Sequence, residues 1–140
     1  DRSHTTKWAG VTAALAFQFS SVFVTHVGNL NIVATSSYLP WALFCLHRMS
    51  QEYRIRWAGG LGICLALAIL AGHAQMAFIV GVAVGLASLW ELSALVRSDL
   101  SKALRITLLL ALALGIALGL TAIALLPAAR RVVTGVGAPW

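Results

Sequence analysis

His73 and Gln75 are the hydrogen-bonding side chains in the apolar stretch ILAGHAQMAFIV, residues 69–80. An ionisable residue at membrane depth is a functional candidate, so the pair could hydrogen-bond a substrate or hold a ligand. The alternative is that both side chains only pair with backbone groups freed where one helix turns into the next, since an unpaired backbone group in lipid costs several kcal/mol. The residues alone leave both interpretations open.

A second polar cluster contains His26, Asn29 and Asn31, around the turn-like segment GNLN at residues 28–31. Asparagine and glycine are common in turns, which favours a structural role for the two asparagines. His26 is open to either role. Even if His26 and His73 met, two histidines without a carboxylate or thiolate make an incomplete zinc site, so we predict no metal bound by these residues. Axial ligation of a haem or pigment by one histidine has no specific signal.

Arg130 and Arg131 follow Pro127, at the end of a long apolar stretch. In the structural interpretation, these long basic side chains reach the membrane interface at little cost. In the functional interpretation they form a phosphate clamp, because the guanidinium fork matches phosphate oxygens. A lipid-linked substrate carries its phosphates at this depth.

The elements that must position these residues are apolar helices. The chain of 140 residues is 60% hydrophobic and 10% charged, whereas an ordinary soluble domain is about 25% charged. A helix needs roughly 20 apolar residues to cross a bilayer core. We therefore predict an all-α, polytopic transmembrane bundle with about five membrane segments. These are residues 8–27, 32–46, 57–72, 76–95 and 106–126, with solvated loops at 47–56 and 96–105. The GxxxG spacings Gly81/Gly85 and Gly115/Gly119 allow close helix contacts, which indicates a packed bundle and nothing more specific.

The basic residues predict the orientation of these segments. If the N-terminus is cytoplasmic, eight of the ten Lys and Arg residues lie on the cytoplasmic side, as the positive-inside tendency requires. The net charge of +6 is then a membrane signal and does not indicate nucleic acid. In this orientation the outer face collects GNLN, the turn GHAQ at residues 72–75, and LLPAARR at residues 125–131.

The carboxylates and thiols do not form a catalytic set. The four acidic residues, Asp1, Glu52, Glu91 and Asp99, all fall on the predicted cytoplasmic side. An acid/base pair needs two groups around one substrate, so we predict no catalytic residue in this stretch and expect Glu91 to be a solvated interfacial carboxylate. Cys45 and Cys64 lie in separate segments without CxxC spacing, which predicts free thiols. The start at Asp1 suggests an internal fragment of a longer chain.

The order of these motifs resembles the bacterial YfhO-like membrane proteins of the GT-C glycosyltransferase superfamily. The similarity rests on ALAFQFSSVFVTHVGNLNIVATSSYLPWALFCLHR (14–48), LAGHAQMAFIVGVAVGLASLWEL (70–92) and LLPAARRV (125–132). The chain departs from the family pattern at Ala74, where proline is expected, and at Asn29, where histidine is common. The external-loop carboxylates of such transferases have no counterpart here and would precede Asp1.

The resemblance implies a transferase that uses polyprenyl-phosphate-linked sugars in the bacterial cytoplasmic membrane. Its implied sugar-phosphate pocket is lined by His26, Asn29, Asn31, His73, Gln75, Arg130 and Arg131. It implies no cofactor for this stretch, with any divalent metal bound by the full-length protein, and membrane lipids as partners. The rival interpretation is a non-catalytic subunit of a larger membrane complex, ligating a pigment or haem through one histidine. A transporter would need an intramembrane charge pair or a broken-helix repeat, and neither is visible.

Overall fold

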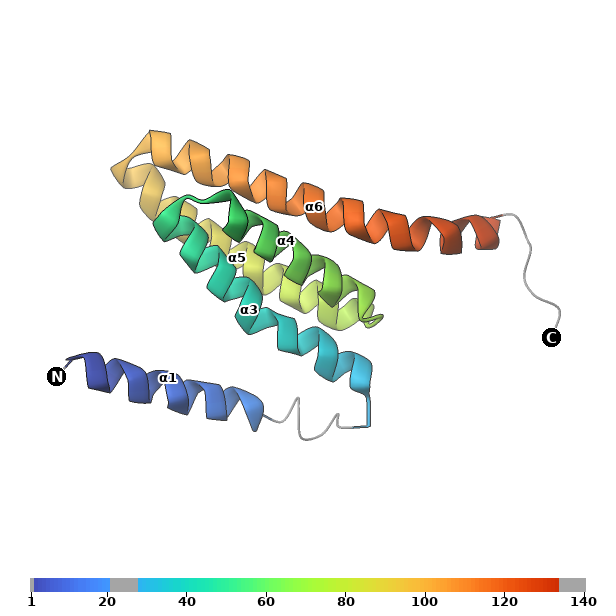
Figure 1. The fold of residues 1–140 in the computed structure, drawn as a ribbon, viewed down its shortest axis with the longest axis horizontal. Coiled ribbons are helices and arrows are strands. Elements are labelled where there is room, and N and C mark those ends of the chain that lie inside the picture. Colours follow the sequence, from blue (N-terminus) through green and yellow to red (C-terminus); the bar gives the residue numbers. More distant parts are fainter. Residues whose placement is uncertain (1, 21–27, 134–140) are drawn as a thin grey trace.

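The computed structural model describes residues 2–20 and 28–133. Within these residues the chain forms five helices and no strand, as the composition predicts. They are α1 (Arg2–Gln18), α3 (Leu30–Glu52), α4 (Ile55–Leu70), α5 (Ala74–Ser98) and α6 (Leu100–Val133). The helices α3 to α6 alternate in direction, so that both ends of the bundle carry a set of helix termini (Figure 1).

Very short turns join the four packed helices. Tyr53 ends α3 in the left-handed conformation, with φ of 54°, and its N–H donates to the Met49 carbonyl oxygen at 3.0 Å. Asp99 separates α5 from α6, and its side-chain oxygen accepts from the backbone N–H of Ser101 at 3.0 Å, as a helix cap does. Turns this short force consecutive helices to lie antiparallel.

The two predicted solvated loops are wrong in extent. The predicted loop 47–56 is helical except for Tyr53 and Arg54, and the predicted loop 96–105 is helical except for Asp99. The physical reason is that charged residues do not end a helix when their spacing lets them pair on its surface. Glu52 pairs with Arg48 within α3, at 2.7 Å and a spacing of four residues.

The number of membrane segments also needs correction. Of the helices that the structure describes, Ala74–Val96 in α5 and Leu100–Leu126 in α6 are long and apolar enough to cross a membrane, rather than about five segments. The helix α4 is apolar but has 16 residues. The helix α1 begins with the polar residues RSHTTK, and α3 contains TSS at 35–37 and ends in charged residues. Predicted segment 8–27 lies partly outside the described residues.

Proline does not end the last helix as predicted. The helix α6 continues through Pro127 to Val133, although proline has no N–H to donate to the Ile123 carbonyl. The helix α3 likewise contains Pro40. A single missing hydrogen bond is tolerated in a helix this long. The backbone of Arg130 and Arg131 therefore belongs to α6.

The packed core lies around α4, which contacts α3 on one side and α6 on the other (Figure 1). Gly62 allows the closest approach, since a Cβ at this position would stand 2.6 Å from the Ala113 carbonyl oxygen of α6. The largest fully buried side chains are Leu46, Met49, Leu61, Ile106, Val80 and Thr35. The hydroxyl of Thr35 donates to the Asn31 carbonyl oxygen at 2.7 Å, which satisfies it inside the bundle.

The outer faces of α5 and α6 are apolar and exposed. Only 11% of the apolar span of α5 and 17% of that of α6 are buried inside the bundle. Phe78, Trp90 and Ile123 are each more than 70% exposed (72%, 77% and 76%). A core helix of a soluble protein would instead be mostly buried, whereas exposed apolar surface of this kind marks a face that contacts a membrane or another protein.

Candidate functional site

A polar hollow lies at the end of the bundle where α3 begins and α4 turns into α5. Asn29, Asn31 and His73 line it, and its volume is about 400 Å³. The remaining lining residues are Gly28, Leu30 and Ile32. The amide nitrogen of Asn31 stands beside the turn, 3.7 Å from where a Cβ on Gly72 would lie. The tertiary structure therefore joins the GNLN and GHAQ segments, which are about forty residues apart in the chain.

The turn itself explains why glycine precedes histidine. Gly72 has φ of +83°, a left-handed conformation that costs a residue with a Cβ but not glycine. His73 is the N-cap of α5, and its Nδ1 accepts a hydrogen bond from the backbone N–H of Met76 at 3.2 Å. Since the backbone N–H must donate, Nδ1 is unprotonated and the neutral ring carries its proton on Nε2. His73 thus serves the backbone and also lines the hollow.

Gln75 is not brought into this hollow. It is exposed in the first turn of α5, two residues beyond His73. Side chains two residues apart on a helix point about 200° away from each other around the axis. Although His73 and Gln75 are close in sequence, the helix separates them.

The other predicted site residues are described only in part. His26 lies outside the described residues. The backbone of Arg130 and Arg131 belongs to the last turns of α6, at the same end of the bundle as the polar hollow (Figure 1). Leu125, one turn earlier, lines a hollow together with Gly72 and Ala74.

The opposite end of the bundle holds a charged cluster that the sequence reasoning missed. Glu52 accepts from Arg56 Nη2 at 2.6 Å and from Trp57 Nε1 at 2.8 Å. The guanidinium carbons of Arg48 and Arg56 lie 5.4 and 5.0 Å from the centre of the Trp57 ring. The hydrogen bonds from Trp57 and then Arg56 hold the pKa of Glu52 below its usual range. The spacing of four residues between 48, 52 and 56 is the signal that could have revealed this cluster.

Two further side-chain pairs join α3 to its neighbours. His47 Nδ1 lies 3.2 Å from Glu91 Oε1, so Glu91 is paired and not simply solvated as predicted. Cys45 and Cys64 are both free, as predicted, and their thiols lie close enough to interact where α3 packs against α4. No sequence signal connects either pair, because their members are far apart in the chain.

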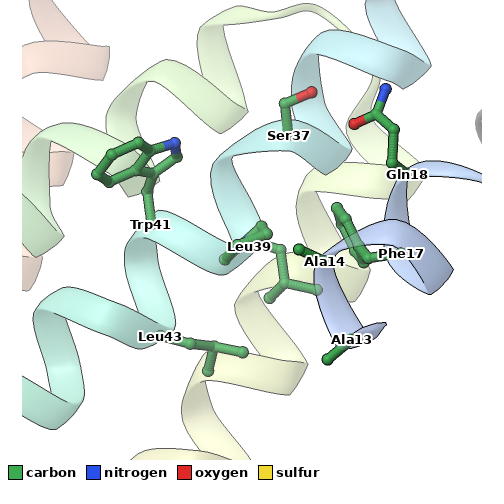
Figure 2. A pocket seen from close by; sticks show the side chains of 9 residues that line it. Ala13, Ala14, Phe17, Gln18, Ser37, Leu39, Trp41 and Leu43 are labelled. Carbon is green, nitrogen blue, oxygen red and sulfur yellow. The ribbon is translucent and has the colours of Figure 1, made fainter. Parts of the chain in front are cut away.

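Another hollow, of about 570 Å³, lies between α1 and α3 (Figure 2). Figure 2 shows Gln18 and Ser37 at one end of it, with apolar side chains such as Phe17 and Leu39 along the rest. The hydroxyl of Ser37 donates to the Val33 carbonyl oxygen at 2.8 Å. This hollow brings together no set of groups suited to catalysis or metal binding.

Among the described residues, no group of three His, Cys, Asp or Glu side chains could hold a metal ion. Comparison of the chain with protein-family models, with curated proteins and with solved structures finds no match. Fold and site therefore define a class: an all-α bundle with two helices suited to a membrane and a polar hollow at one end.

Proposed function

We propose that this chain is a membrane-embedded part of a GT-C-type glycosyltransferase, in which the polar hollow binds the head group of a polyprenyl-phosphate-linked sugar. The observation that supports this proposal most is the meeting of Asn29, Asn31 and His73 around one hollow of about 400 Å³. The membrane location is supported by two long apolar helices whose outer faces are exposed.

The donors around the hollow suit phosphate oxygens and sugar hydroxyls. Asparagine amides and the His73 Nε2–H donate hydrogen bonds, and the start of α5 carries the positive end of a helix dipole. Arg130 and Arg131 follow on α6 at this end and would add charge-assisted hydrogen bonds. No carboxylate lines the hollow, so the acid/base group and any divalent metal would come from another part of a longer chain.

The proposed location is the bacterial cytoplasmic membrane, with the polar hollow on the outer side. Most of the basic residues lie at the other end, in or within about two helical turns of the connections that join α3 to α4 and α5 to α6. Such residues belong on the cytoplasmic side by the positive-inside tendency, which also places the start of α1 there.

Binding of undecaprenyl phosphate to the full-length protein in detergent micelles tests this function. Asn31→Ala removes a donor from the hollow and is expected to weaken binding about tenfold, because a hydrogen bond to a charged group is worth about 1.5–3 kcal/mol. Gln75→Ala is the matched control, since Gln75 is exposed and does not line the hollow. Full binding by Asn31→Ala, or an equal loss in both variants, would overturn the assignment.

The role of His73 as the N-cap of α5 argues against the rival function, a subunit that ligates a haem or pigment. An axial histidine binds through an unprotonated nitrogen, whereas the neutral ring of His73 uses its unprotonated Nδ1 for the Met76 N–H. Of the two histidines whose side chains the structure describes, His47 keeps Nε2 for such ligation, because its Nδ1 faces Glu91. A visible absorption band that disappears in His47→Ala would favour the rival.

A further inference from the structure

A further cavity, which we call the α4–α5–α6 crevice, lies between these three helices. Its volume is about 290 Å³, and its lining includes Leu65 of α4, Val84 of α5 and Leu114 of α6. Every lining residue is apolar except Ser88, whose hydroxyl donates to the Val84 carbonyl oxygen at 2.8 Å. The crevice therefore presents no unsatisfied side chain and suits an apolar occupant.

Glycines on α5 open this crevice. A Cβ at Gly81 or Gly85 would meet nothing within 4 Å, although both residues line the cavity. The close helix contact that this GxxxG spacing would allow is therefore not made at Gly81 and Gly85. Gly62 makes the close contact instead, drawing α4 against Ala113 of α6, while the face of α5 with the two glycines stays open.

The crevice continues to the polar end of the bundle. A neighbouring hollow of about 450 Å³ shares Ile69 and Ala77 with the crevice and extends to Gly72, Phe78 and Leu125. Gly72 in turn lies beside the amide of Asn31 in the polar hollow. An apolar path thus runs from the turn between α4 and α5 into the middle of the bundle.

The length of the crevice matches one leaflet of a bilayer. Along α5 the crevice extends from Ala77 to Ser88, which is about 16 Å at 1.5 Å per residue. Half of a bilayer core is about 15 Å thick. An acyl chain that spans one leaflet therefore fits the length of the crevice and its apolar lining.

We propose that the α4–α5–α6 crevice binds one acyl chain of a membrane phospholipid, with the phosphate head group at the turn that contains Gly72. The chain lies against Gly81 and Gly85 and ends near Ser88, at mid-depth. A polyprenyl chain is much longer than one leaflet and would extend beyond the crevice. This inference rests on the proposed membrane location and is independent of sugar transfer.

Photo-crosslinking in proteoliposomes of the full-length protein tests the site. The probe is phosphatidylglycerol with a diazirine at the end of one acyl chain, and the labelled residues are located by mass spectrometry. Label is expected near Ser88 and Leu61 rather than on outward-facing Leu108. Moving the diazirine close to the head group should shift the label to Ile69 and Ala77. Label spread evenly over the outer faces, with either probe, would overturn the proposal.

Filling the crevice provides a second measurement. Gly85→Leu places a side chain in the open space and should lower labelling of crevice residues about tenfold. Gly119→Leu is the matched control, because a Cβ at Gly119 also meets nothing within 4 Å but this residue does not line the crevice. Unchanged labelling in folded Gly85→Leu would contradict the site. If Gly85→Leu fails to fold, the shift of label between the two probes in the wild-type protein decides alone.

Three controls separate this proposal from the others. Displacement of the label by undecaprenyl phosphate at lower concentration than by phosphatidylglycerol would assign the crevice to a polyprenyl chain and overturn the acyl assignment. Alkaline carbonate extraction tests the membrane location. If the protein stays in the membrane but is not labelled, only the crevice proposal is rejected. If carbonate releases the protein, the membrane location itself is rejected. Loss of undecaprenyl phosphate binding in Asn31→Ala with intact labelling separates the two sites.

Discussion

Gly62 of α4 lies directly against the backbone of Ala113 in α6, with room for a hydrogen but not for a methyl group. A Cβ at Gly62 would stand 2.6 Å from the Ala113 carbonyl oxygen and 2.9 Å from Ile116 Cβ. The nearest obstacle is a backbone oxygen, which cannot rotate away as the end of a side chain can, and Ile116 Cβ is held in place by its own backbone. This contact joins α4 to the longest apolar helix of the described residues and sets the spacing of the bundle.

Gly62→Ala should destabilise the fold because it forces α4 and α6 apart. Overpacking of this kind typically costs about 1–3 kcal/mol, to be measured by denaturant titration in micelles. Gly59→Ala is the control on the same helix, since a Cβ there meets nothing within 4 Å. It should be neutral, or stabilising by up to about 1 kcal/mol, because alanine favours a helix more than glycine does. Equal effects of the two substitutions would contradict the close approach.

His73→Ala should destabilise the start of α5 because the Met76 N–H loses its acceptor. Loss of an N-cap costs about 0.5–2 kcal/mol, and asparagine is a good replacement cap. His73→Asn should therefore restore the unfolding free energy while still lacking the imidazole that lines the hollow. Unfolding free energies of both variants, beside their undecaprenyl phosphate affinities, separate capping from binding. If His73→Asn is as unstable as His73→Ala, the cap is not what His73 contributes.

Glu52 should make the stability depend on pH in the acid range. Its pKa is lowered in the folded chain by hydrogen bonds from Trp57 and Arg56. A carboxyl whose pKa is lower in the folded than in the unfolded chain stabilises the fold at pH values above its unfolded pKa, which is about 4 for glutamate. This stabilisation is lost as the pH falls through the pKa of the folded chain. Wild type should melt at a higher temperature than Glu52→Gln at pH 7, and the two should converge at acid pH. Parallel melting curves at all pH values would exclude this linkage.

Cys45 and Cys64 should form an intramolecular disulfide under oxidation by copper phenanthroline. Their thiols lie close enough to interact between α3 and α4, and the oxidant removes two electrons as the two protons leave. Maleimide counting after denaturation should fall from two free thiols to none. Cys64→Ser should keep its single thiol. Two reactive thiols remaining in oxidised wild type would show that α3 and α4 do not pack as described.

Sequence patterns predicted part of the candidate site. Alternating apolar segments placed GNLN and GHAQ at the same end of the bundle, and the structure brings Asn29, Asn31 and His73 around one hollow. Gln75 does not line this hollow, since it is exposed in the first turn of α5. The patterns failed at the charged stretches, where pairs such as Arg48 and Glu52 continue the helix.

The sequence by itself determined that the chain is helical and apolar, and which ends of the helices carry polar residues. These properties follow from composition and spacing, which act locally along the chain. Only the tertiary structure decided that Gly62, rather than Gly81 or Gly85, makes the close contact, and that His47 meets Glu91. Such pairings depend on how the helices rotate and tilt against one another. Many apolar faces are chemically alike, so shape complementarity between helices settles what hydropathy leaves undetermined.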